Sequence, residues 1–85
     1  LEVFLNIEVK LFSPFIFLDG NRTCNIEIED GAKLSDLMCL LDNSGLFDPY
    51  GKDSLLVIID NNIINDDYVL QDKQKVEILL QVSGG

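Results

Sequence analysis

The chain has 85 residues, enough for one small domain, and 47% of them are hydrophobic, so it can fold around a single modest core. It has 15 acidic residues, 6 basic residues and no histidine, which gives a formal net charge of −9. This charge argues against nucleic acid and anionic membranes as partners, because phosphate binding needs a basic patch. It is compatible with a basic protein partner, or with a role in solubility alone.

Two segments near the start alternate between apolar and polar residues, which is the period of a strand with one buried face. The first, residues 3–12 (VFLNIEVKLF), turns every second residue toward a core and leaves Phe4 and Phe12 on the outward face. The second, residues 23–29 (TCNIEIE), turns Cys24 inward. Together they predict an antiparallel hairpin with a long connection, in which Cys24 fills part of the core.

The next segment, KLSDLMCLLDNSG, has the apolar spacing of one helix face. Asp36 near its start suits the helix dipole, and the sequence from Asn43 to Gly45 provides a stop signal. Cys39 falls opposite the apolar stripe, so we expect a partly exposed thiol that forms no disulfide. The predicted stripe consists of Leu34, Leu37, Met38 and Leu41.

The second half of the chain predicts a loop and three further strands. Residues 46–54 form the loop, and the apolar run LLVII at 55–59 is typical of a strand buried on both faces. Residues 60–62 (DNN) predict a tight turn, because asparagine tolerates positive φ. A short strand at 63–64 and a last, alternating strand at 76–82 (VEILLQV) complete the order.

This order predicts one α+β domain spanning residues 1–85, with a mixed sheet packed on one main helix. A long N-terminal hairpin and a crossing helix allow the first and last strands to lie side by side and parallel. That arrangement is the β-grasp, or ubiquitin-like, fold. It places the last strand in the centre of the sheet and leaves a free Gly-Gly tail, residues 83–85.

The two terminal glycines point to chemistry at the chain end. Gly84 and Gly85 have no Cβ, so their backbone can enter a channel too narrow for any side chain. Adenylation by ATP would make the carboxylate of Gly85 an acyl donor, which a sulfur donor could convert to a thiocarboxylate or an amine to an isopeptide. The chain has no histidine, CxxC motif or Cys/His metal set, so we expect a carrier or substrate, not an enzyme by itself, with no metal.

The sequence resembles the MoaD/ThiS family of sulfur carrier proteins over nearly its whole length. VKLF, DGAKLSDLMCLL, DNN and VEILLQVSGG occur in the family's order. The resemblance implies that an E1-like enzyme uses ATP to adenylate Gly85, which then carries the thiocarboxylate, and that the carrier itself binds no cofactor. It also implies that Gly84 passes a tunnel in the partner, with Val82 and Ser83 at its mouth and Leu79 in contact with the partner.

Two branches of the family are consistent with the chain. The architecture favours the MoaD branch, the small subunit of molybdopterin synthase, which inserts its tail into the large subunit. The Leu80-Gln81 step, where many MoaD sequences have prolines, is more similar to ThiS, which supplies sulfur to thiazole synthase in thiamine biosynthesis. The chain also has Lys33 where the family often has Thr, and lacks the usual glycine in its Asp72-Lys73-Gln74 turn.

Two other functions remain open. The same tail suits a ubiquitin-like modifier joined to lysines. Phe4, Phe12 and Leu79 on the outward phase suit a non-catalytic interaction module, and we include Phe4 among the predicted partner contacts. No apolar run approaches the length of a membrane span and no secretory leader is visible, so we expect a cytoplasmic protein.

Overall fold

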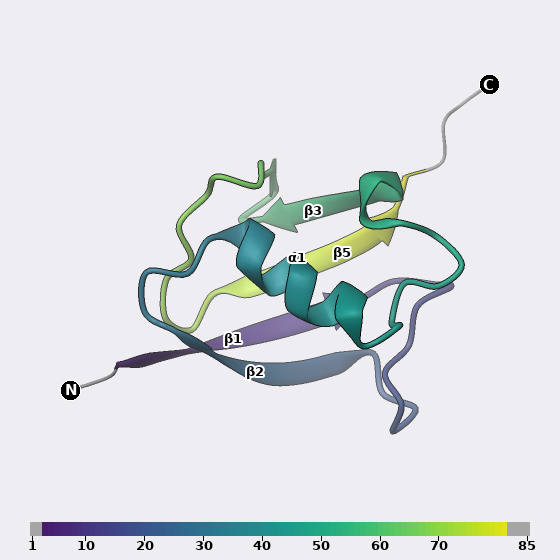
Figure 1. The fold of residues 1–85 in the computed structure, drawn as a ribbon, viewed down its shortest axis with the longest axis horizontal. Helices are drawn as coiled ribbons and strands as arrows, with labels where there is room; N and C mark the ends of the chain where they lie inside the picture. Colours follow the sequence, from purple (N-terminus) through teal and green to yellow (C-terminus); the bar gives the residue numbers. More distant parts are fainter. Residues whose placement is uncertain (1–2, 82–85) are drawn as a thin grey trace.

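The computed structural model describes residues 3–81 and arranges them as a five-stranded sheet with α1 lying across one face (Figure 1). The strand order is β2-β1-β5-β3-β4, with β1 and β5 parallel and the other pairs antiparallel. This confirms the predicted α+β architecture with the last strand in the centre. No helix among residues 3–81 is long and apolar enough to cross a membrane. The elements are β1 (Phe4–Leu11), β2 (Thr23–Glu29), α1 (Leu34–Asn43), the 3₁₀ helix η1 (Lys52–Ser54), β3 (Leu55–Ile59), β4 (Asn62–Ile63) and β5 (Lys75–Leu80).

The N-terminal hairpin forms as predicted, but its two strands are buried to different degrees. The inward residues of β1 are almost inaccessible, from Leu5 at 6% exposure to Leu11 at 0%. Cys24, which pairs with Val9, is only half-buried and lies outside the core cluster. The prediction that Cys24 fills the core is therefore wrong. The reason is that β2 is an edge strand, at the margin of the layer that α1 covers.

Helix α1 buries the predicted stripe and begins without a side-chain acceptor at its N-cap. Lys33 occupies the N-cap position, and its ammonium cannot accept a hydrogen bond. Asp36 compensates in part, because its Oδ2 accepts from the Lys33 backbone N–H at 2.9 Å. Cys39 is exposed, as expected. The buried stripe is Leu34, Leu37, Met38 and Leu41.

The missing N-cap is replaced by main-chain carbonyls from a distant segment. The Leu34 N–H donates to the Tyr68 carbonyl at 2.8 Å, and the Ser35 N–H donates to the Asp66 carbonyl at 3.1 Å. These are two of the amides that a helix start leaves without a partner. The segment between β4 and β5 therefore holds the start of α1 in place.

Two aromatic residues from loops enter the core. Phe15 and Phe47 are 3% and 0% exposed, and their rings meet edge to face with centroids 5.3 Å apart. Tyr50 also meets Phe15 edge to face, with centroids 5.9 Å apart. The sequence patterns assigned both segments to loops and gave no core role to either phenylalanine. The loops are therefore tied to the core by aromatic packing.

Strand β3 is buried on one face only, which corrects the prediction for the LLVII run. Val57 and Ile59 are buried beneath α1, whereas Leu56 and Ile58 on the outer face are only partly covered. The reason is that a single helix covers a single face of this sheet. The outer apolar residues of β3 are therefore available for contact.

Two tight turns adopt the left-handed backbone conformation. Asp60 and Asn61, with φ of 52° and 66°, join β3 to β4 as the DNN motif predicted. Lys73 has φ of 66°, a conformation that glycine favours, at the position where the family usually has one. The turn is held because the Lys73 N–H donates to the Asn6 carbonyl at 2.7 Å and the Asn6 N–H donates to Asp72 Oδ1 at 2.8 Å.

We predict that Phe47→Ala lowers the free energy of unfolding by about 3–5 kcal/mol, because it removes a fully buried ring and leaves a cavity. Phe4→Ala is the matched control: Phe4 is 46% exposed, and its loss changes stability by only about 0.5 kcal/mol. Urea denaturation monitored by circular dichroism measures both values. Equal losses for the two variants would show that Phe47 is not part of the core.

Candidate functional site

The end of β5 determines where the chain leaves the domain. Leu80 pairs with Leu55 of β3, and the Gln81 N–H then donates to the Ser54 carbonyl at 2.8 Å. This hydrogen bond extends the pairing one residue beyond β5, next to η1 (Figure 1). The predicted site residues Val82, Ser83, Gly84 and Gly85 lie outside the described residues.

An apolar row crosses the outer face of the sheet at this same end. Leu79 is half-buried and lies opposite Leu56 in the register of β5 and β3. Phe12 follows Leu11, the partner of Ile78, and its N–H donates to the Ile78 carbonyl at 3.1 Å, so Phe12 lies beside Leu79. We call Phe12, Leu79 and Leu56 the outer apolar row.

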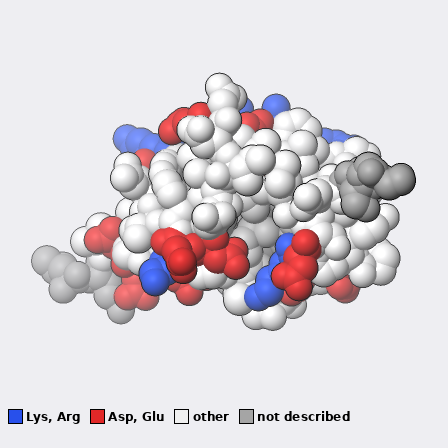
Figure 2. All heavy atoms as spheres, turned by 90° about the horizontal axis from the view of Figure 1, so that it is seen from above, with Lys and Arg blue, Asp and Glu red and all other residues white. Residues whose placement is uncertain are grey.

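Charged residues flank the row. Lys10 Nζ lies 5.1 Å from the centroid of the Phe12 ring, within the range of a cation–π contact. Lys10 is the register neighbour of Glu77, and Glu77 is that of Ile58. Figure 2 looks at the molecule from the β3 edge, with the sheet seen edge-on, and shows uncharged surface between groups of acidic and basic side chains; the outer face that carries the row is not turned toward the viewer. An apolar centre with a charged rim is the usual composition of a protein interface.

Phe4 does not join this row. It is 46% exposed, as its outward phase predicted, but it pairs with Glu29 at the opposite end of β1 from Phe12. The structure therefore brings Leu79 to the point where the chain leaves the domain and leaves Phe4 far from it. The sequence did not predict that Leu56 belongs to this row. The reason is that the LLVII run does not alternate between apolar and polar residues, so it does not distinguish an outer face from an inner one.

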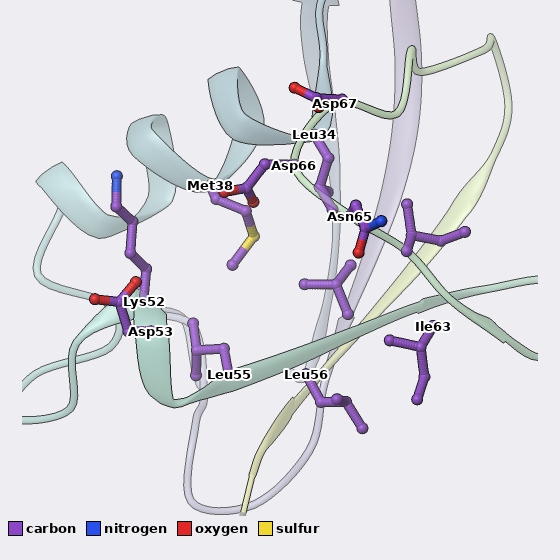
Figure 3. A pocket seen from close by; sticks show the side chains of 12 residues that line it. Leu34, Met38, Lys52, Asp53, Leu55, Leu56, Ile63, Asn65, Asp66 and Asp67 are labelled. Carbon is purple, nitrogen blue, oxygen red and sulfur yellow. The ribbon is translucent and has the colours of Figure 1, made fainter.

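An open pocket of about 490 Å³ lies between α1, η1 and the segment that follows β4 (Figure 3). Figure 3 shows the Met38 sulfur projecting into it and Lys52 beside Asp53 on one side, with Asp66 and Asp67 across from them. The walls are apolar at Leu34, Met38, Leu55 and Val57.

Lys52 is the basic group of this pocket, and it is hydrogen-bonded to a cysteine of α1. Lys52 Nζ donates to Cys39 Sγ at 3.5 Å, and this hydrogen bond raises the pKa of Lys52 from its usual value. The ammonium therefore stays charged at neutral pH and cannot serve as a general base. No group of three or more potential metal ligands occurs among residues 3–81.

Comparison with known proteins identifies the family. A model of the ThiS family matches residues 9–85, which includes both glycines. The chain belongs to the ThiS family. Its members are ubiquitin-fold sulfur carriers related to MoaD, and they generally work with E1-like enzymes and partner subunits. No curated protein sequence matches the chain.

Solved structures share the fold. SAMP1 from Haloferax volcanii has a TM-score of 0.73 and 19% identity, with 94% of this chain and 99% of that chain covered. Molybdopterin converting factor subunit 1 from Pyrococcus furiosus has a TM-score of 0.74 and 23% identity, covering 92% and 99%. Ubiquitin from Caldiarchaeum subterraneum has a TM-score of 0.68 and 12% identity, covering 98% and 100%. At these identities the likeness establishes the ubiquitin-like β-grasp fold of this family member.

We predict that Gln81→Pro lowers the free energy of unfolding by about 1 kcal/mol, because proline has no N–H to donate to the Ser54 carbonyl. Gln81→Ala is the control, since it removes the side chain and keeps the main-chain donor. Urea denaturation compares the two variants. If both are equally stable, the hydrogen bond does not anchor the end of β5.

Proposed function

We propose that this ThiS-family protein carries sulfur on the carboxyl group of Gly85. The observation that supports this most is the position of β5: it is the central strand, hydrogen-bonded on both sides, and its end adjoins the outer apolar row. A partner that docks on the row would therefore receive the chain end in a defined direction. The family match, which extends to Gly85, supports the same site.

The proposed chemistry has two steps, and partner proteins supply the catalytic groups for both. In the first, a carboxylate oxygen of Gly85 attacks the α-phosphorus of ATP, which forms an acyl-adenylate and releases pyrophosphate. In the second, a sulfur nucleophile attacks the acyl carbon and AMP leaves. When the nucleophile is hydrosulfide, loss of its proton leaves the thiocarboxylate on Gly85. When it is a persulfide, the product is an acyl disulfide, and a thiol must attack its outer sulfur and leave as a disulfide with it to release the thiocarboxylate. The absence of side chains at Gly84 and Gly85 permits entry into a narrow active site.

The outer apolar row is the proposed docking surface for the E1-like adenylating enzyme and for the sulfur acceptor. Both partners must reach the same carboxyl group. The row lies near Gln81, which is the last residue before this group that the structure describes. The two partners would therefore bind one after the other. The net charge of −9 favours partners with a basic surface around the apolar contact.

The proposed acceptor is the large subunit of molybdopterin synthase, to which this chain would be the small subunit. The fold-level likeness to a molybdopterin converting factor subunit supports this choice. The alternative acceptor is thiazole synthase. The residue at position 81 favours this alternative, because the chain has no proline there and the Gln81 N–H instead extends the sheet by one residue. Sulfur transfer to each purified acceptor, measured side by side, separates the two pathways.

A second candidate function is attachment to lysines as a ubiquitin-like modifier. The likeness to SAMP1, a small archaeal modifier protein, and to an archaeal ubiquitin favours it. The acyl-adenylate is common to both functions, and only the final nucleophile differs, sulfur in one case and a lysine amine in the other. Denaturing blots of cell extract that contain only free protein would contradict the modifier function.

The carrier proposal predicts a defined mass change. Incubation with its adenylating enzyme, ATP and a sulfur donor should increase the intact mass by the difference between one sulfur and one oxygen atom. Deletion of Gly85 should abolish this change and leave the circular dichroism spectrum unaltered, because Gly85 belongs to none of the described helices and strands, which end with β5 at Leu80. An unchanged mass in the presence of enzyme that is active on another carrier would contradict the proposal.

The docking proposal predicts that Leu79→Ala weakens binding to the adenylating enzyme by at least about tenfold, which corresponds to about 1.4 kcal/mol. Phe4→Ala serves as the matched control, because Phe4 is also exposed but lies at the other end of β1. Isothermal titration calorimetry measures both affinities. A larger loss for Phe4→Ala than for Leu79→Ala would move the docking surface to the other end of the sheet.

A further inference from the structure

A groove lies along the seam between β2 and α1, at the edge of the sheet opposite to β3 and β4. One part of it has a volume of about 550 Å³ and is mostly apolar. Leu18 is fully exposed here, and Leu40 and Ile16 are 51% and 46% exposed, so this apolar surface has no cover in the described structure. Its apolar lining includes Ile16, Phe17, Leu18, Cys24, Ile26 and Leu40.

A second part of the groove lies toward the start of α1, and its lining is acidic where that of the first part is apolar. Leu40 lines both parts, and the residues of β2 that line them, Cys24 and Ile26 in the first and Ile28 and Glu29 in the second, follow one another along the strand. The second part is lined by Ile28 and by the acidic residues Glu29, Asp30 and Asp36, with no basic residue among its lining. Of these, Glu29 is on the outward phase of β2, since it pairs with Phe4. We call the whole feature the β2–α1 groove. It has an apolar half and an acidic half, in line along the strand.

The free edge of β2 borders the groove. The Leu11 N–H donates to the Arg22 carbonyl at 2.7 Å and the Asp30 N–H donates to the Val3 carbonyl at 2.8 Å, so the even-numbered residues of β2 bond to β1. The odd-numbered residues of the strand therefore direct their N–H and C=O groups away from the sheet. Within residues 3–81, no strand pairs with this side of β2. An unpaired edge of this kind is a template for an added strand.

We propose that β2 and the β2–α1 groove bind an extended segment of a partner protein, which adds to the sheet as a further strand. Its alternate apolar side chains would fill the apolar half of the groove, around Ile26 and Leu40. Lysine or arginine residues at one end would lie beside Glu29, Asp30 and Asp36. Backbone pairing supplies affinity in this mode, and the groove supplies specificity.

The negative charge of β2 favours a basic segment, and not a second copy of the chain, as the occupant of this edge. A second copy of β2 (TCNIEIE) would bring Glu27 and Glu29 and no basic side chain to an edge that already carries Glu27, Glu29 and Asp30, and like charges on neighbouring strands are destabilising. A basic segment replaces this repulsion with attraction. The site is separate from the outer apolar row, which lies on the other face of the sheet and closer to the other edge, so both could be occupied together. The inference does not depend on chemistry at Gly85.

Synthetic peptides test the proposal. The probes are KKVTITLTS and its retro sequence STLTITVKK, which place the basic pair at either end, and EEVTITLTS as the charge-reversed control. We expect saturable binding of at least one basic probe by fluorescence anisotropy, and binding at least about tenfold weaker for the acidic probe. Amide chemical shifts should change along residues 23–30 and at Leu40, and not at Leu79. Binding should be the same after deletion of Gly85, which distinguishes this site from the sulfur-carrier function.

Two pairs of variants locate the contacts. Leu40→Gln should weaken binding of the basic probe at least about fivefold, whereas the same change at Ile63, a more exposed apolar residue on β4, should not. Asp30→Asn should weaken it, whereas Asp53→Asn, which makes the same change in net charge near η1, should not. The proposal is overturned if neither basic probe saturates, if the shifts fall on the outer apolar row, or if the free chain dimerises through β2.

Discussion

The pairing of β5 between β1 and β3 is the constraint on which the rest of the structure depends. Val76 and Ile78 of this strand are completely buried, and hydrogen bonds hold it on both sides. Because β5 runs parallel to β1 and antiparallel to β3, its end lies beside Phe12 and Leu56. The positions of Leu80 and Gln81, the last residues that the structure describes, are therefore fixed by the most buried part of the sheet.

The single helix divides the sheet into a covered face and an open one. On the covered face, α1 buries the core, and the carbonyls of Asp66 and Tyr68 satisfy its first amides. On the open face, Leu79 and its neighbours stay half-buried and available. The edge at β2 is open for the same reason: the helix reaches the seam and leaves an exposed groove there. The proposed docking row and the proposed strand-addition site both follow from having one helix for five strands.

The sequence predicted those parts of the fold that follow from a clear period. Alternation located β1, β2 and β5, and the leucine spacing located α1. The sequence could not reveal that Phe47 is buried. A loop residue has no periodic pattern, and its partner Phe15 comes from a distant loop. It misjudged Cys24 and the LLVII run because burial there depends on which faces and edges the helix covers. The role of Leu56 in the outer row was missed for this last reason, whereas the outward phase of Leu79 was correct.

The central claim is that the function of this protein is carried by the carboxyl group of Gly85, presented by β5. The most direct measurement is the mass of the C-terminal peptide of the protein isolated from its own cells, after alkylation with iodoacetamide. The account predicts a peptide that ends at Gly85 and includes an alkylated thiocarboxylate fraction, which disappears when the adenylating enzyme is deleted. A peptide that extends beyond Gly85 in every molecule, or one that ends there but is never modified in any growth condition, would contradict it.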